Sequence, residues 1–207
     1  IMKKIIFVSF ALLFLLVAIH NNGEAAMSGN LVRLPTANMI DATGEVAATL
    51  NSSGAEVTAI AKLMPWLEAG GKIYSNGNIN SELSPLAKVL IIDEYNYGLN
   101  LAAGYEDDLY ITSSKTLEYN LKGYLGYRNH GGLFVGVAKT FNQEEIQIRE
   151  SNNDESVVSS IPPIRVALEY YNKDFNIGIR SNINNTLRAE LALIDLSDFS
   201  AGLSYSF

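Results

Sequence analysis

From residue 44 onward, the chain is a series of short runs in which apolar and polar residues alternate. The pattern is clearest at its end, where Phe199, Ala201, Leu203, Tyr205 and Phe207 alternate with serine and glycine. Side chains on a strand point alternately to its two faces, so one face of such a run is apolar and the other tolerates water. This period of two predicts strands and not helices.

Twelve such runs are separated by turn residues. They span residues 44–52, 56–63, 66–74, 86–93, 97–105, 109–116, 118–127, a run marked by Leu133, Val135 and Val137, and then residues 164–171, 175–181, 187–195 and 199–207. Residues 75–85 form a polar loop, and the insertion 142–163 either is a loop or hides a further strand at residues 145–149. We predict an all-β fold, an antiparallel up-and-down transmembrane β-barrel of about twelve strands, with ten or fourteen left open.

The apolar final run would be an aggregation hazard at the edge of a soluble sheet. Barrel closure removes that edge, and lipid then covers the apolar face. We therefore predict outer-membrane lipid and the barrel-assembly machinery as partners, with Tyr205 and Phe207 as the assembly signal. Aromatic residues near the ends of runs, such as Trp66, Tyr95 and Tyr119, predict interfacial girdles, although aromatic residues also favour strands in general.

The positions that alternate with the apolar ones along these runs carry charges of both signs. These candidate lumen-facing charges are Glu45, Glu56, Lys62, Glu68, Lys72, Lys88, Glu94, Lys122, Arg165, Glu169, Arg180, Arg188 and Glu190. Each would cost a few kcal/mol against lipid near the midplane, whereas inside the barrel they can pair. They predict either a filled, ion-paired interior or a lined path for a polar solute, because twelve strands lie between the filled and the open sizes.

The beginning of the chain resembles a cleaved secretory signal peptide. Lys3 and Lys4 precede an apolar stretch, residues 5–19, and small residues follow up to Ala26. The stretch is shorter than the ~20 residues of a spanning helix, which favours cleavage over a membrane anchor. The predicted organisation is a signal peptide over 1–26, a lead-in or plug segment over 27–43, and the barrel over 44–207.

Composition narrows the function classes. The 207 residues contain no cysteine, so disulfides and thiolate metal sites are ruled out. The formal charge of −7 argues against nucleic acid as a partner. Of two histidines, His130 lies in a glycine-rich turn and suits solvent better than catalysis. We predict no catalytic residue, no metal and no cofactor.

Two stretches carry a family resemblance. Residues 29–39 contain Leu34-Pro35-Thr36-Ala37 and precede an acidic-glycine turn, and residues 63–69 contain Pro65-Trp66-Leu67-Glu68. Together they resemble the start and an early hallmark of the YjbH-like family of outer-membrane proteins. The resemblance implies a bacterial outer-membrane barrel in a short, single-barrel form, without enzymatic activity, linked to exopolysaccharide or capsule production, with polysaccharide or secretion-system proteins as partners. Residues 34–37 would then either plug the barrel mouth or simply lead into the first strand.

The function hypothesis is a non-enzymatic outer-membrane barrel serving polysaccharide secretion or surface organisation. Its rivals are a small general porin for polar solutes, a barrel enzyme acting on outer-membrane lipid, and a soluble secreted β-sandwich. The sandwich would need polar outward positions, which the runs lack.

Overall fold

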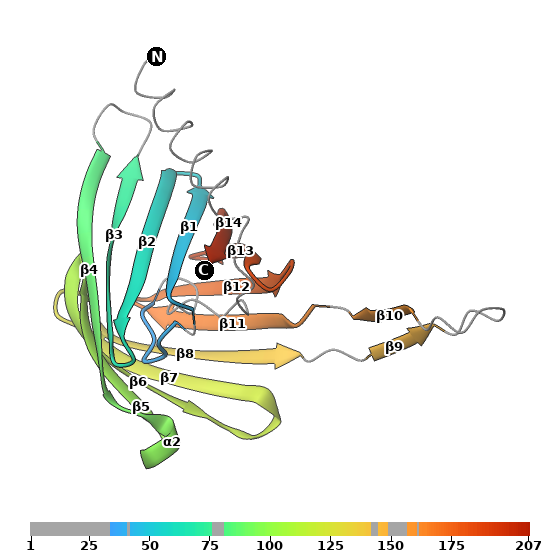
Figure 1. The fold of residues 1–207 in the computed structure, drawn as a ribbon. Coiled ribbons are helices and arrows are strands. Elements are labelled where there is room, and N and C mark those ends of the chain that lie inside the picture. The colour runs from blue at the N-terminus through green and yellow to red at the C-terminus, as the bar shows by residue number, and fades with distance from the viewer. Residues whose placement is uncertain (1–33, 41, 76–80, 142–144, 149–156, 161) are drawn as a thin grey trace.

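A closed antiparallel barrel of twelve strands forms the body of the protein (Figure 1). The computed structural model describes residues 34–40, 42–75, 81–141, 145–148, 157–160 and 162–207. The predicted signal peptide and the first part of the lead-in lie outside these residues. Neighbouring strands follow the chain order around the barrel except that β11 pairs with β8, and β1 pairs with β14 to close the ring. The twelve-stranded barrel expected from the alternation is confirmed.

The barrel strands agree in place with the alternating runs. Their bounds are β1 Gly44–Asn51, β2 Gly54–Met64, β3 Leu67–Ser75, β4 Ser81–Ile92, β5 Asn100–Glu106, β6 Asp108–Thr116, β7 Leu121–Arg128, β8 Gly132–Phe141, β11 Ile164–Tyr171, β12 Asp174–Asn182, β13 Leu187–Ile194 and β14 Asp198–Ser206. We call the end where β1 begins and β14 finishes the terminal end, and the opposite end the turn end.

The two faces of the barrel differ as the alternation requires. On β7, Tyr124 is buried, whereas its neighbour Leu125 is half exposed. Outward side chains such as Leu168, Leu191 and Leu203 are likewise apolar and exposed. A closed ladder leaves no backbone group unpaired toward lipid, so an apolar outer surface on such a barrel fits a membrane. No helix of the described residues is long and apolar enough to cross a membrane.

Three expectations about local structure were wrong. The predicted loop 75–85 ends earlier, because β4 begins at Ser81 and includes Pro85, which removes only one ladder bond. The predicted strand 97–105 begins at Asn100, since Glu94–Tyr97 forms a short helix, α2, capped by Asp93 and ended by Gly98 at φ 75°. Similarly, a single 3-10 turn, η2 Glu118–Asn120, precedes β7 where a longer strand was expected.

The insertion between β8 and β11 contains two strands, one more than the alternative weighed for it. β9 Glu145–Ile148 pairs with β10 Val157–Ser160 in a separate two-stranded sheet. Figure 1 shows this pair beyond the ends of β8 and β11. The strand order places those ends at the terminal end of the barrel.

The seam between the first and last strands is closed by backbone bonds. The N–H of Gly44 donates to the carbonyl of Phe207 at 3.0 Å, and the N–H of Phe207 donates to the carbonyl of Gly44 at 3.0 Å. Thr43 adds a hydroxyl bond to the same Phe207 carbonyl at 2.7 Å. A Cβ at Gly44 would lie 2.5 Å from the Phe207 ring, so glycine permits this ring to lie over the seam.

Candidate functional site in the barrel lumen

Residues 34–40, called here the luminal segment, lie inside the barrel. Leu34, Thr36, Ala37 and Ile40 are each at most 3% exposed. The segment's hydrogen-bond partners are inward side chains of β3, β5, β6, β7 and β11, which stand on different sides of the ring. The segment therefore crosses the lumen and fills part of it.

Two buried glutamates hold the ends of the luminal segment. The N–H of Leu34 donates to Glu169 Oε1 at 3.0 Å, and Asn176 donates to the other oxygen of that carboxylate at 3.2 Å. At the far end, the N–H of Ile40 donates to Glu68. Glu169 and Glu68 are 1% and 2% exposed, so these carboxylates lie out of bulk water and need the partners they have.

The middle of the luminal segment is held through Asn38. Its side-chain oxygen accepts from Ser114 Oγ at 3.0 Å and from Asn100 Nδ2 at 3.3 Å. Lys88 donates to its backbone carbonyl and also pairs with Glu68 at 2.9 Å. Backbone groups that lack a strand partner must be satisfied in another way when buried, and here charged wall residues satisfy them.

Three arginines lie side by side on the β11–β13 wall. Arg165 is directly opposite Arg180 in the register, and Arg180 is opposite Glu190. Arg180 Nε donates to Glu190 Oε2 at 2.6 Å, and Arg188 pairs with Glu45 at 3.4 Å. The Arg188–Glu45 pair is almost fully buried, whereas the Glu190 side chain is 26% exposed, and both carboxylates compensate arginine charge within the wall.

A group of ion pairs lies at the turn end of the barrel. It includes Glu106 and Arg128, which fall between the strands predicted from the sequence. Glu106 pairs with Lys72 at 3.5 Å and with Arg128 at 3.4 Å. Glu106 and Arg128 continue the inward-facing alternation of β5 and β7, and this alternation could have identified them as lumen residues. Asp107 also pairs with Lys72. Burial alone would raise the pKa of Asp107, but its bonds with Lys72 outweigh burial and hold it below the ordinary value.

The terminal end opens into a polar cavity of about 650 Å³, called here the vestibule. The luminal segment forms part of its lining through Ala37, Asn38 and Met39. Lys122 and Arg165 are its lining cations, and amide, hydroxyl and apolar side chains make up most of the remainder. The lumen is thus accessible from this end as far as the luminal segment.

Glu94 lies beside the vestibule, on α2 and not on a strand as its parity had suggested. It pairs with Lys122 at 3.3 Å and accepts from the N–H of Thr116. Burial alone would raise the pKa of Glu94, but the Thr116 N–H and the Lys122 ammonium hold it below its ordinary value. Glu94 therefore keeps its charge and neutralises Lys122 at this rim.

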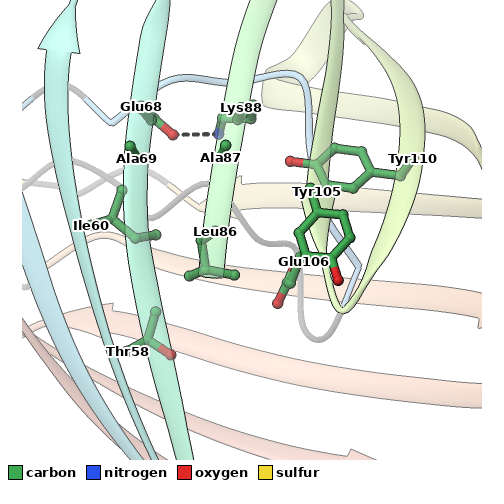
Figure 2. A pocket seen from close by; sticks show the side chains of 10 residues that line it. All are labelled: Thr58, Ile60, Glu68, Ala69, Leu86, Ala87, Lys88, Tyr105, Glu106 and Tyr110. Atoms are coloured by element: carbon green, nitrogen blue, oxygen red, sulfur yellow. Dashed lines mark ion pairs between the residues drawn. The ribbon is translucent and has the colours of Figure 1, made fainter. Parts of the chain in front are cut away.

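A second, smaller cavity of about 40 Å³ lies in the wall near the Glu68–Lys88 pair (Figure 2). Thr58, Glu106 and Tyr110 contribute to its lining. Figure 2 shows the Glu68 carboxylate and the Lys88 ammonium facing each other across adjacent strands. This space holds a few water molecules at most, so it cannot take a solute.

The remaining sequence-predicted residues are distributed as follows. Glu56 and Lys62 have the inward parity of β2, and Lys62 donates to the Ile40 carbonyl at 2.7 Å. Pro65 and Trp66 form the turn before β3, and Trp66 is 48% exposed.

The rings of Tyr205 and Phe207 stack at 6.3 Å beside the seam. At the turn end, His130 Nδ1 lies 3.0 Å from Asp108 Oδ1.

A closed barrel with an apolar outer face and a charged lumen defines the class of outer-membrane β-barrels. Among solved structures, the chain is similar to the KdgM porin, with a TM-score of 0.51 and 10% identity, and to the KdgM porin in complex with disordered oligogalacturonate, with a TM-score of 0.51 and 11% identity. Each match covers 79% of this chain and 98% of the other. At this identity the likeness shows the fold. No protein-family model and no curated protein matches the chain.

Proposed function

We propose that this chain is a non-enzymatic outer-membrane channel for polar solutes, whose conductance is limited by the luminal segment. The observation that carries the proposal is the position of residues 34–40 inside the lumen, held by side chains of the wall. These contacts are hydrogen bonds and not covalent links. Water or a polar solute can replace them, because each such bond contributes only about 1 kcal/mol net, or about 1.5–3 kcal/mol where a carboxylate accepts.

The lumen would remain polar if the luminal segment moved. Glu68, Lys88 and Glu169 point inward from β3, β4 and β11. A solute path through a barrel needs such groups, whereas a purely structural barrel can be filled with apolar side chains. The fold shared with the porins supports this proposal.

A disulfide lock tests the proposal, since the chain has no cysteine of its own. Asn38 Oδ1 and Ser114 Oγ are 3.0 Å apart, so Asn38→Cys with Ser114→Cys places one thiol on the luminal segment and one on the β6 side chain that faces it. In planar lipid bilayers, the oxidised double variant should hold a low conductance that a reductant raises. Removal of residues 34–40 should give the largest conductance. Each single-cysteine variant is the control and should not respond to the redox change.

Two results would overturn the proposal. Equal conductance before and after reduction, with the disulfide verified by mass, would show that the segment does not limit the path. Absence of conductance in the variant without residues 34–40, once its barrel is shown to be folded by its heat-dependent gel mobility, would exclude the channel itself.

A role in exopolysaccharide secretion is a second candidate, favoured by one contact. The two stretches that resemble the YjbH-like family meet in space, since the N–H of Ile40, next to the first stretch, donates to Glu68 of the second. Pro65 also lines the vestibule together with Ala37. Deletion of the gene in its host, complemented by the wild type or by Glu68→Gln, tests this role by the amount of surface polysaccharide. Unchanged polysaccharide in the deletion strain would exclude it.

A further inference from the structure

The vestibule has the composition of a binding site for a polar but uncharged ligand. Its volume of about 650 Å³ lies within the range of roughly 300–1,000 Å³ typical of small-molecule sites. Leu90, Leu121 and Pro65 supply apolar lining. Asn182 and Thr140 supply amide and hydroxyl groups. Such a mixture suits a ligand with both C–H faces and hydroxyl edges.

The polar groups of the vestibule form one continuous wall. Thr116 on β6 is the register partner of Lys122 on β7, and Thr140 on β8 is the partner of Arg165 on β11. Asn182 follows at the end of β12. Because these strands are neighbours in the barrel, their side chains present a row of donors and acceptors to whatever enters from the terminal end.

The charged side chains around the vestibule already have partners within the protein. Lys122 pairs with Glu94 at 3.3 Å. Arg165 donates to the Tyr124 hydroxyl and lies 5.7 Å from the centre of the Tyr124 ring. Asp93 is an anion of the lining, and it caps α2 by accepting from the Tyr95 N–H. An incoming anion would therefore have to compete with Glu94 for Lys122, and the Asp93 carboxylate of the lining would repel it.

By contrast, several neutral groups are available to a ligand. Within the described ranges, the side chains of Asn182 and Thr140 have no hydrogen-bond partner in the protein. We infer that the vestibule binds uncharged, hydroxyl-rich saccharides in preference to acidic ones, through Asn182 and Thr140. This inference rests on the proposed channel function, for which it names the class of solute and the end at which the solute binds.

Binding can be measured without any conductance. The folded barrel in detergent micelles is titrated with maltohexaose, a neutral probe, and separately with hexagalacturonic acid, an acidic probe of the same length, while the side-chain amide signal of Asn182 is followed by NMR. Maltohexaose should shift that signal and bind more tightly than the acidic probe. Thr140→Val, followed by the same signal, and Asn182→Ala, followed by isothermal titration calorimetry, should each weaken maltohexaose binding about three- to tenfold, as expected for loss of one hydrogen bond.

Ser204→Ala is the matched control, because Ser204 has the inward parity of β14 but does not line the vestibule. It should bind maltohexaose as the wild type does. Tighter binding of the acidic probe would overturn the inference, and so would the lack of any Asn182 shift with maltohexaose. Neither result would alter the disulfide-dependent conductance, so failure here is distinguishable from failure of the channel.

Discussion

The Glu68–Lys88 pair provides the sharpest test of how the lumen is held together. Their charged atoms are 2.9 Å apart, and the two side chains are only 3% and 8% exposed. Each also binds the luminal segment, Glu68 through the Ile40 N–H and Lys88 through the Asn38 carbonyl. Lys88→Met removes the ammonium while keeping most of the side-chain volume, and so leaves the Glu68 carboxylate buried without its cation.

The expected cost follows from that burial. Breaking one side of a buried pair destabilises a protein by about 3–5 kcal/mol, because the remaining charge is uncompensated. Glu68→Gln combined with Lys88→Met removes both charges and should cost less, about 1–3 kcal/mol, chiefly from the lost bond to the Asn38 carbonyl. The double variant should therefore be more stable than Lys88→Met alone.

Urea unfolding of the barrel in lipid vesicles measures these free energies, with the fluorescence of Trp66, the one tryptophan of the chain, as signal. Lys173→Met, at an exposed turn position, is the control and should change stability by less than about 0.5 kcal/mol. The reasoning fails if Lys88→Met costs less than about 1 kcal/mol. It also fails if the double variant costs the sum of the two single variants, since the charges would then not be coupled.

Three further predictions concern other parts of the barrel. The pKa of Glu94 is lowered in the folded barrel, so its stabilising effect is present above the ordinary pKa of 4.5 and is lost as the pH falls through the lower pKa of the folded state. The melting temperatures of the wild type and Glu94→Gln should therefore differ at pH 7 and converge at acid pH. A difference in melting temperature that does not change with pH would contradict this. Leu125→Arg should destabilise the barrel by about 2–4 kcal/mol in vesicle unfolding experiments if that face meets lipid near the midplane, and a neutral result would contradict the lipid assignment. Gly126→Ala would place a Cβ 2.1 Å from the Phe134 ring and 2.7 Å from a backbone oxygen, so we expect a cost of about 1–3 kcal/mol by urea titration, which unchanged stability would disprove.

Strand ends were harder to predict than strand positions, for a physical reason. A proline or a polar cluster marks a turn only statistically, and β4 continues through Pro85 because its neighbours β3 and β5 supply the rest of the ladder. The short helix α2 similarly overrides the alternation of residues 97–99, since the Asp93 cap and Gly98 favour a local turn. Local patterns compete at such boundaries, and the tertiary context decides between them.

The luminal segment shows what no local pattern could reveal. Leu34 binds Glu169, which is 135 residues away in the chain, and Ile40 binds Glu68, 28 residues away. Residues 34–40 have neither a helical nor a strand period, so the sequence left a plug and a simple lead-in equally open. The same holds for the vestibule, whose wall is assembled from β6, β7, β8, β11 and β12.

The alternation along the chain was sufficient to locate the twelve barrel strands, apart from their ends, together with their two faces and the inward parity of the charges, because the period of two is a property of the extended backbone. It thereby determined that a closed barrel would put apolar groups outward and ion pairs inward. The folded barrel was needed to show which inward charges pair, such as Lys72 with Glu106, and that residues 34–40 occupy the lumen. Those features depend on ring closure, which brings distant strands within the few ångströms over which hydrogen bonds and ion pairs act.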